Sequence, residues 1–451
     1  MANDWPLKKL KDLGVAVIDC VHKTPKAQSD GIPYVGIPQM KNGSIDFDAN
    51  PRLISEKDYL EWTIKANPSH GDIILSRRCN PGETAYVPKN AKFALGQNLV
   101  LLRPNPKTIH PGYLRWAVNS PIWWAEVNKY RNPGAVFDSL KCADIPNFEI
   151  PAPPYSAQIT IDELLLALSD KIELNRQINQ TLEQMAQTLF KSWFVDFDPV
   201  MDNALDAGNP IPGELQHRAE ARKAVRESES FKPLPDDVRQ LFPDAFEESE
   251  LGWVPKGWGV STAGDEFTVK GGSTPSTKSA EFWEGGDIHW TSPKDLSGKA
   301  EKILLDTERK ITATGLNKIT SGLLPPETVL MSSRAPVGYL AMTKIPVAIN
   351  QGYIAITESK SLTQEFALYW LDSRIEMIKS ISGGTTFAEI SKKTFRTIPI
   401  VVPSAQSVNA FSETVALYLS KISKNVEECS SLSALRDSLL PKLISGELEI
   451  S

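Results

Sequence analysis

Apolar residues recur at alternating intervals of four and three along two long segments of the chain. From about Ala157 to Phe194 there is no Gly or Pro. The first seam consists of Ile161, Leu165, Leu168, Ile172, Leu182, Ala186, Leu189 and Trp193, and the second of Phe411, Val415, Tyr418, Ile422, Cys429, Leu432, Leu439 and Leu443. This spacing predicts two long helices, each with a coiled-coil face.

Each seam contains one asparagine near its middle, Asn175 in the first and Asn425 in the second. If the helices pair antiparallel about a pseudo-twofold axis, their middles meet and these asparagines come together. A polar residue in a seam costs stability and fixes the register of the pair. The alternative is that both side chains face solvent at a break in the heptad pattern.

The stretches before these helices contain shorter apolar runs, interrupted by Gly, Pro and Asn. The runs DIILS, FALGQNLVLL, TVLMSS and AINQGYIAI predict β-strands. Residues 110–130 and 362–381 have the length and apolar spacing of helices. Each stretch is therefore expected to form a mixed α/β domain of ordinary size.

The chain carries this plan twice. With an offset of 250 residues, Phe137 matches Phe387 and Asn175 matches Asn425, and upstream an offset of 256 matches Arg78 with Arg334. Tyr34 matches Trp290 with the same offset of 256, and Gln97 matches Gln351 with an offset of 254. An internal repeat of this length is incompatible with chance similarity and sets the fold.

The predicted fold class is α+β, with two tandem mixed α/β domains, each followed by a long α-helix, and with the two helices paired as an antiparallel coiled coil. We expect a first domain over residues 1–156, a first helix over 157–199, an acidic and Pro-rich connector over 200–256, a second domain over 257–404 and a second helix over 405–451. The connector is expected to be only partly ordered, with one short helix at 214–228.

Charge is divided along the chain in the same way. Residues 1–150 carry a net charge of +4 and 257–404 one of +1, whereas 151–199 carry −4 and 200–256 carry −5. A polyanion would therefore meet the two domains rather than the connectors. No apolar run approaches the length of a membrane span, and the four widely spaced cysteines indicate reduced thiols in a cytoplasmic protein without a zinc site.

The common catalytic signatures are missing from the sequence. There is no Walker A phosphate loop, no G-x-G-x-x-G and no H-E-x-x-H, and the five histidines show no helical pairing. We therefore assign no catalytic residue and no metal ligand. Besides a recognition protein without catalysis, two classes of protein stay open. One is a DNA methylase or nuclease with its own recognition domains, and the other is a coiled-coil scaffold without a DNA function.

Residues suited to recognition are present instead. Arg77, Arg78 and Arg334 follow apolar strands in Gly-containing loops, where an arginine can fork to guanine or to phosphate. The pairs Gln97-Asn98 and Asn350-Gln351 suit bidentate hydrogen bonds to adenine. The Gly-rich loop that contains Thr385 and Thr386 offers backbone N–H groups to phosphate. The alternative for each is an ordinary turn or surface residue.

At this point the chain resembles the specificity (S) subunit of type I restriction-modification systems. The resemblance covers the whole length. It rests on the doubled plan of domain and helix, on the run S-x-R-x-P-V-G at 332–338, on INQG at 349–352 and on GGTTF at 383–387. Further marks are QTLFKSWFVDFDPV at 187–200, LFPDAFEESELGWVPKGW at 241–258 and LLPKLISGEL at 439–448.

The resemblance implies two target recognition domains that each read one half of a bipartite site in double-stranded DNA, with the helices as a spacer between half-sites. It implies partners, namely two methyltransferase (M) subunits and two restriction/translocase (R) subunits, which bind S-adenosylmethionine, ATP and Mg, so that this chain holds no cofactor. The candidate DNA-binding residues are Tyr34, Arg77, Arg78, Gln97, Asn98, Trp290, Lys294, Ser333, Arg334, Asn350, Gln351, Thr385 and Thr386. Asn175 and Asn425 are the candidate register residues of the spacer.

Overall fold

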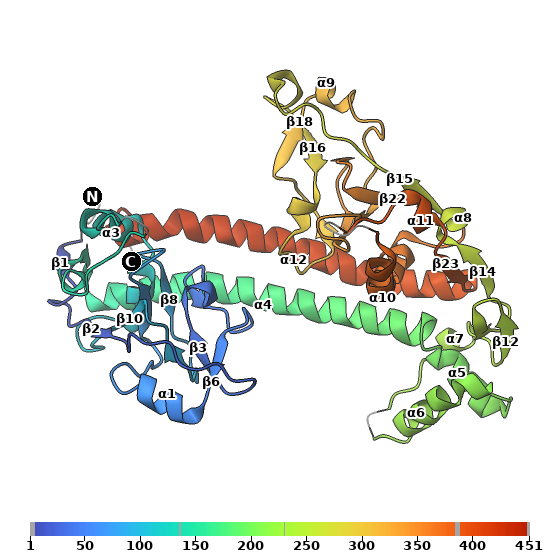
Figure 1. The fold of residues 1–451 in the computed structure, drawn as a ribbon, viewed down its shortest axis with the longest axis horizontal. Helices are drawn as coiled ribbons and strands as arrows, with labels where there is room; N and C mark the ends of the chain where they lie inside the picture. The colour runs from blue at the N-terminus through green and yellow to red at the C-terminus, as the bar shows by residue number, and fades with distance from the viewer. Residues whose placement is uncertain (1–4, 135–136, 230, 384–387, 449–451) are drawn as a thin grey trace. The chain divides into compact units, whose positions relative to one another are not determined.

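The computed structural model describes residues 5–134, 137–229, 231–383 and 388–448. The chain forms two compact units, one made of Met1–Glu173 with Cys429–Ser451 and the other of Leu174–Glu428. Each unit contains one mixed α/β domain and parts of both long helices (Figure 1). The two units are described in turn.

The domain of the first unit is built on two small sheets. The first sheet has the order β2-β10-β7-β8, with strands Ala16–Asp19, Leu99–Arg103, Ile73–Ser76 and Thr84–Tyr86. The second has the order β6-β3-β9, with strands Arg52–Ile54, Ile32–Val35 and Ala94–Leu95. Two further pairs are β1 (Leu7–Lys9) with β11 (Glu149–Pro151) and β4 (Met40–Lys41) with β5 (Ser44–Ile45). The α-helices are α1 (Glu56–Trp62), α2 (Pro111–Ala117) and α3 (Pro121–Tyr130).

The domain of the second unit repeats this plan. Its larger sheet has the order β15-β22-β19-β20-β17, with strands Phe267–Lys270, Tyr353–Ser359, Val329–Ser332, Leu340–Thr343 and Ile303–Leu304. Its smaller sheet has the order β18-β16-β21, with strands Arg309–Ile311, Ile288–Thr291 and Ala348–Ile349, and β14 (Gly259–Thr262) pairs with β23 (Pro399–Val402). The α-helices are α8 (Ala263–Glu266), α9 (Ala313–Leu316), α10 (Gln364–Ile381) and α11 (Lys392–Arg396).

The repeat extends to the register of the strands. Tyr34 lies opposite Ala94 in a parallel pair, and Trp290 lies opposite Ala348 in the equivalent parallel pair. Ser76 lies opposite Leu99, and Ser332 lies opposite Tyr353. The prediction of two copies of one mixed α/β domain is therefore confirmed.

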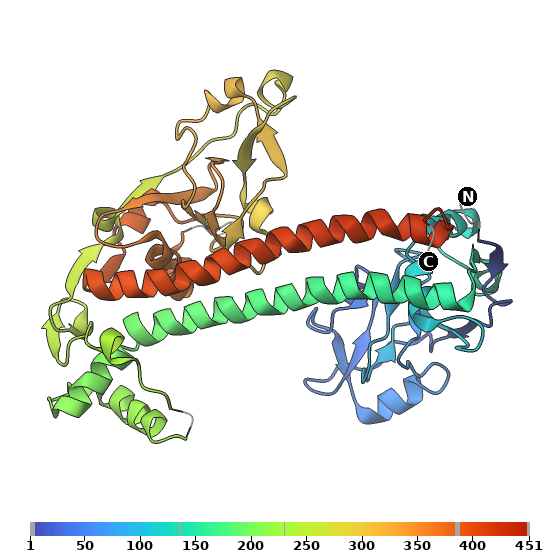
Figure 2. The ribbon, with the colours of Figure 1, turned by 180° about the vertical axis from the view of Figure 1, so that it is seen from behind.

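The two long helices are α4 (Tyr155–Phe194) and α12 (Ala405–Ser445). In the first unit, Ile161 and Leu165 from the start of α4 share a core with Leu443 and Ile444 from the end of α12 (Figure 2). The helix α2 approaches α4 closely at Gly112, where a Cβ atom would lie 1.8 Å from a carboxylate oxygen of Asp162. That carboxylate accepts a hydrogen bond of 2.8 Å from the buried indole of Trp116 and fixes the domain on the helix.

In the second unit, the start of α12 lies beside the end of α4 (Figure 1). The core is aromatic: Phe190 lies 5.0 Å from Phe366 and 5.6 Å from Phe411, measured between ring centroids. Trp193 lies 5.1 Å from Phe242 in the same way. The aromatic residues of the run at 187–200 thus form the joint between helix, connector and domain. Since each unit combines the start of one helix with the end of the other, the helices pair antiparallel as expected.

Both seam asparagines are fully buried, so the alternative that they face solvent is wrong. They do not bond to one another. The Asn175 amide donates to Glu428 over 2.9 Å, and the Asn425 amide donates to Asn179 over 2.8 Å. Each asparagine is thus matched to a polar residue of the opposite helix. A slipped register would also leave the amide nitrogens of Asn175 and Asn425 without acceptors, in addition to their side-chain oxygens, which are already buried without a partner among the described residues.

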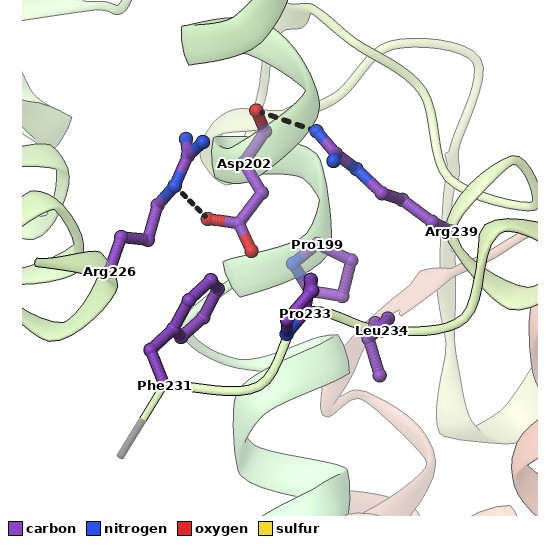
Figure 3. A pocket seen from close by; sticks show the side chains of 7 residues that line it. All are labelled: Pro199, Asp202, Arg226, Phe231, Pro233, Leu234 and Arg239. Carbon is purple, nitrogen blue, oxygen red and sulfur yellow. Dashed lines mark hydrogen bonds and ion pairs between the residues drawn. The ribbon is translucent and has the colours of Figure 1, made fainter. Parts of the chain in front are cut away.

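The connector is more ordered than the sequence indicated. It contains α5 (Asp198–Ala207), α6 (Gln216–Arg226), α7 (Asp236–Arg239) and a hairpin of β12 (Phe246–Ser249) and β13 (Gly252–Pro255). Asp202 of α5 accepts from the Arg222 guanidinium at 2.6 Å, and Asp206 bonds to Arg226 and Arg239, which lower the pKa of its carboxyl. A hollow of about 40 Å³, no larger than a few water molecules, lies beside Asp202. Figure 3 shows the side chains that line it. The acidic, Pro-rich composition of the connector does not by itself predict these ion pairs.

Candidate functional site

The predicted recognition arginines lie in equivalent hairpin loops. In the first unit the loop joins β7 to β8, and the Gly82 amide donates to the Ser76 carbonyl over 3.0 Å. In the second unit the loop joins β19 to β20, and the Gly338 amide donates to the Ser332 carbonyl, also over 3.0 Å. Both glycines have a positive φ, +102° and +109°. A side chain at either position would collide with the helix behind the loop, so the glycines seat the loop against that helix.

A second loop is bonded to each arginine loop. Arg78 forms a bridge with Ser139, and Arg334 forms the equivalent bridge with Glu389. The Arg334 guanidinium also lies 3.9 Å from the Glu389 carboxylate and is about one-third exposed. Thr385 and Thr386 lie outside the described residues, but the base of their loop is closed by hydrogen bonds between Gly383 and Glu389.

The predicted amide residues lie next to the arginine loops. In the first unit the Arg77 amide donates to the Asn98 carbonyl over 2.9 Å, and in the second the Ser333 amide donates to the Gly352 carbonyl over 2.8 Å. Gln97 is exposed, as is its counterpart Gln351. Asn350 uses its side-chain oxygen to hold the Gly352 amide at 2.8 Å, so it shapes the turn that presents Gln351.

Tyr34 and Trp290 are buried, with 8% and 5% exposure, and act behind this turn rather than at its surface. The Tyr34 hydroxyl accepts from the Gln97 amide at 3.0 Å and donates to the Lys23 carbonyl at 3.2 Å. The Trp290 indole donates to the Ser273 carbonyl at 3.3 Å. Tyr34 therefore ties the glutamine turn to a neighbouring segment, and Trp290 ties its own strand to the equivalent segment of the second unit.

That neighbouring segment was missed in the sequence. It reads Lys-Thr-Pro at 23–25 and Ser-Thr-Pro at 273–275, again with an offset of 250. The Thr274 hydroxyl donates to the Gln351 side-chain oxygen over 2.7 Å and fixes that amide. Thr24 lines the cleft beside Gln97. The repeated Thr-Pro dipeptide is the signal that could have found this segment.

In the first unit these loops surround a cleft of about 660 Å³. Its walls come from the Thr-Pro segment, the β3–β4 turn, the arginine loop and the glutamine turn. The lining residues include Thr24, Tyr34, Lys41, Cys79, Asn80, Gln97 and Asn98. The walls offer amide, hydroxyl and ammonium groups, which suit the edges of nucleic-acid bases and the phosphates beside them.

Two of the predicted cations lie near a carboxylate but differ in exposure. The Arg77 side chain is only 12% exposed, with its guanidinium 3.9 Å from the Asp19 carboxylate. Lys294, by contrast, is exposed and lies 2.8 Å from Glu308, which raises the pKa of its ammonium group. Ser333 is buried and contributes backbone groups to the loop. Among the predicted residues that the structure describes, Lys294, Arg78 and the two glutamines are thus exposed, whereas Arg334 is partly buried.

One group in the described part of the chain has the composition of a metal site: Asp19, Cys20 and His22. Burial and the adjacent Asp19 carboxylate raise the pKa of the Cys20 thiol to about 11, and that thiol donates to the Gly96 carbonyl at 3.3 Å. His22 bonds to Asp19 at 2.9 Å and to the Gln97 carbonyl at 3.1 Å. Through the bonds to the Gly96 and Gln97 carbonyls, Cys20 and His22 support the glutamine turn. In the part of the chain that the structure describes, no helix is long and apolar enough to span a membrane.

Comparison with known proteins agrees with this doubled arrangement. The family model described as the type I restriction modification DNA specificity domain matches residues 2–184 and again residues 255–427. The type I restriction enzyme HindI specificity subunit of Haemophilus influenzae is 29% identical over 405 residues, which cover 84% of this chain and 86% of that protein. The putative type I restriction enzyme MjaX specificity subunit of Methanocaldococcus jannaschii is 24% identical, with 99% and 94% covered.

A solved structure has the same fold. The S subunit of a type I restriction-modification system from M. genitalium aligns with a TM-score of 0.55 at 17% identity, covering 100% of this chain and 97% of that one. The two matched domains together span well over half of the sequence. The chain therefore belongs to the family of type I restriction-modification DNA specificity subunits.

Proposed function

We propose that this chain reads a bipartite DNA site, with one half-site read by each domain. The observation that carries the proposal is the doubled set of loops. In both units an arginine loop, a glutamine turn and a Thr-Pro segment are joined by equivalent hydrogen bonds. The loop residues themselves differ between the copies, for instance Cys79 against Ala335, as expected if the two half-sites differ in sequence.

The long helices set the distance between half-sites and dock the partner subunits in this proposal. Their surfaces retain large apolar side chains in solvent: Leu164, Leu174 and Met185 on α4, and Leu417 and Leu435 on α12. Apolar residues on otherwise polar helices favour contact with another protein. The partners are two methyltransferase and two restriction/translocase subunits, which hold S-adenosylmethionine, ATP and Mg, while this chain has no catalytic role of its own.

Two arginine variants test the reading of half-sites. Methylation mapping in a host that carries the chain and its partners first gives the bipartite motif. Arg334→Ala should then weaken or relax recognition of one half-site, by about 1–3 kcal/mol if the contact is to a base. Arg78→Ala should do the same at the other half-site.

The two variants act as controls for each other. Equal losses at both half-sites in either variant would contradict the assignment of one domain to one half-site. The purified chain with S-adenosylmethionine and no partner should transfer no methyl group. Methyl transfer by the chain alone would support the alternative of an enzyme with its own recognition domains.

A further inference from the structure

An arginine occupies the same register position in both domains. Arg52 is the first residue of β6 and lies opposite Tyr34, whereas Arg309 is the first residue of β18 and lies opposite Trp290. Their separation of 257 residues differs from the offsets that relate the neighbouring motifs, so only the strand pairing identifies them as equivalent.

Arg309 rests on an aromatic platform. The carbon of its guanidinium lies 3.4 Å from the ring centroid of Trp283 and 5.5 Å from that of Trp290. The two indoles are perpendicular, with centroids 5.1 Å apart. A guanidinium stacked on a ring keeps its N–H edges available for a planar acceptor.

Among the residues that the structure describes, no acidic side chain neutralises this guanidinium. The nearby Glu308 is engaged by Lys294 at 2.8 Å, and Asp306 is engaged by His289 at 3.2 Å and by Lys310 at 3.9 Å. Within the described residues, Arg309 has no carboxylate in ion-pair distance. A partly exposed cation is thus held in place by packing alone.

The platform is continuous with the glutamine turn. The Trp283 indole donates to the Ser276 carbonyl at 3.0 Å, and the Trp290 indole donates to the Ser273 carbonyl at 3.3 Å. Thr274, between them, bonds to the Gln351 side chain. The same short segment therefore positions both Arg309 and the residue proposed to read a base.

The geometry points to Arg309 as a contact to a DNA backbone phosphate beside the half-site read by the second domain, with Arg52 as its counterpart in the first. This inference rests on the proposed function. A phosphate suits this site because the guanidinium carries a full positive charge that no carboxylate of the described residues neutralises, and its planar fork matches two phosphate oxygens. The sugar-phosphate backbone is common to every half-site, and the bases are not.

The test measures the salt dependence of binding by the full-length chain. Two duplexes serve as probes, one with the motif found by methylation mapping and one with the same bases scrambled. Arg309→Ala should weaken both complexes by the same factor and reduce the slope of log affinity against log salt by about 0.9. The factor by which Arg309→Ala weakens binding should therefore fall about threefold to fourfold between 50 and 200 mM salt.

Lys310→Ala is the matched control, because Lys310 carries the same charge on the opposite face of the same strand. It should change the slope much less than Arg309→Ala does. Arg309→Lys, which keeps the charge, should retain most of the slope. If Arg309→Ala lowers the unfolding temperature, Arg309→Gln, which keeps a planar group over the ring, replaces it.

Three results would overturn the phosphate contact: an unchanged slope in Arg309→Ala, a loss confined to the motif duplex, or an equal effect of Lys310→Ala. Failure of the proposed function gives a different result. In that case the wild-type chain would show no preference for the motif duplex over the scrambled one.

Discussion

Glu183 is the buried acid that fastens the second domain to α4, and its replacement by alanine gives a quantitative test. Its carboxylate accepts from the Lys302 amide at 3.1 Å, from the Lys302 ammonium at 3.3 Å and from the Tyr369 hydroxyl at 3.0 Å. The Glu183 side chain is only 7% exposed. Burial and the adjacent Glu183 raise the pKa of the Tyr369 hydroxyl, which therefore stays a donor.

The loss in free energy of unfolding caused by Glu183→Ala follows from the buried groups that lose their hydrogen-bond acceptor. A buried donor without an acceptor costs about 1–3 kcal/mol, and breaking a buried ion pair costs about 3–5 kcal/mol. The Lys302 ammonium keeps Asp372 at 3.5 Å, which reduces its share. We therefore expect a loss of about 3–4 kcal/mol in the second unit.

Differential scanning calorimetry of the full chain measures this loss. For a unit of this size, 1 kcal/mol shifts the melting temperature by roughly 2–4 °C, so the transition of the second unit should fall on the order of 10 °C. Gln184→Ala is the matched control, since Gln184 is the exposed neighbour on the same helix. It should leave the transition within about 1–2 °C.

A double-mutant cycle identifies the cause. Tyr369→Phe removes the hydroxyl, so Glu183→Ala should cost less in that background, by about 1 kcal/mol. Equal costs in the two backgrounds, or a Glu183→Ala shift no larger than that of Gln184→Ala, would refute the role of Glu183 in holding the second domain on α4.

Four further predictions concern the helices and the first domain. Leu417→Glu, at a side chain that is 72% exposed, should abolish co-purification with a methyltransferase subunit and leave the melting temperature unchanged. One heptad inserted after both Glu173 and Glu428 lengthens the pair by about 10 Å. This equals about three base pairs, so methylation mapping should show a longer spacer with unchanged half-sites. Because the pKa of Cys20 is raised to about 11, only about one thiol in a thousand ionises at pH 8, and a thiol reagent should label exposed Cys79 well before Cys20. As the pH rises from about 9 to 11, the stability that this protonated thiol contributes should decline.

Much of the architecture is determined by the sequence alone, because it is written in local periodicity. The seams that include Ile161 and Phe411 lack Gly and Pro over long stretches, and only a helix places such residues on one face. The matched pairs Arg78/Arg334 and Gln97/Gln351 reveal the repeat from the sequence as well. A repeat is detected by aligning the chain with itself, so the contacts between distant residues need not be known.

Tertiary structure decided which recognition residues are accessible and how they are held. Tyr34 and Arg77 looked equivalent to their exposed neighbours, yet packing buries one and brings the other near Asp19. Arg52 and Arg309 are recognised as equivalent positions only from the strand register of the two sheets. Asn175 forms its hydrogen bond with Glu428 rather than with Asn425. Strand register and side-chain partners depend on contacts between residues far apart in the chain, and no local pattern encodes them.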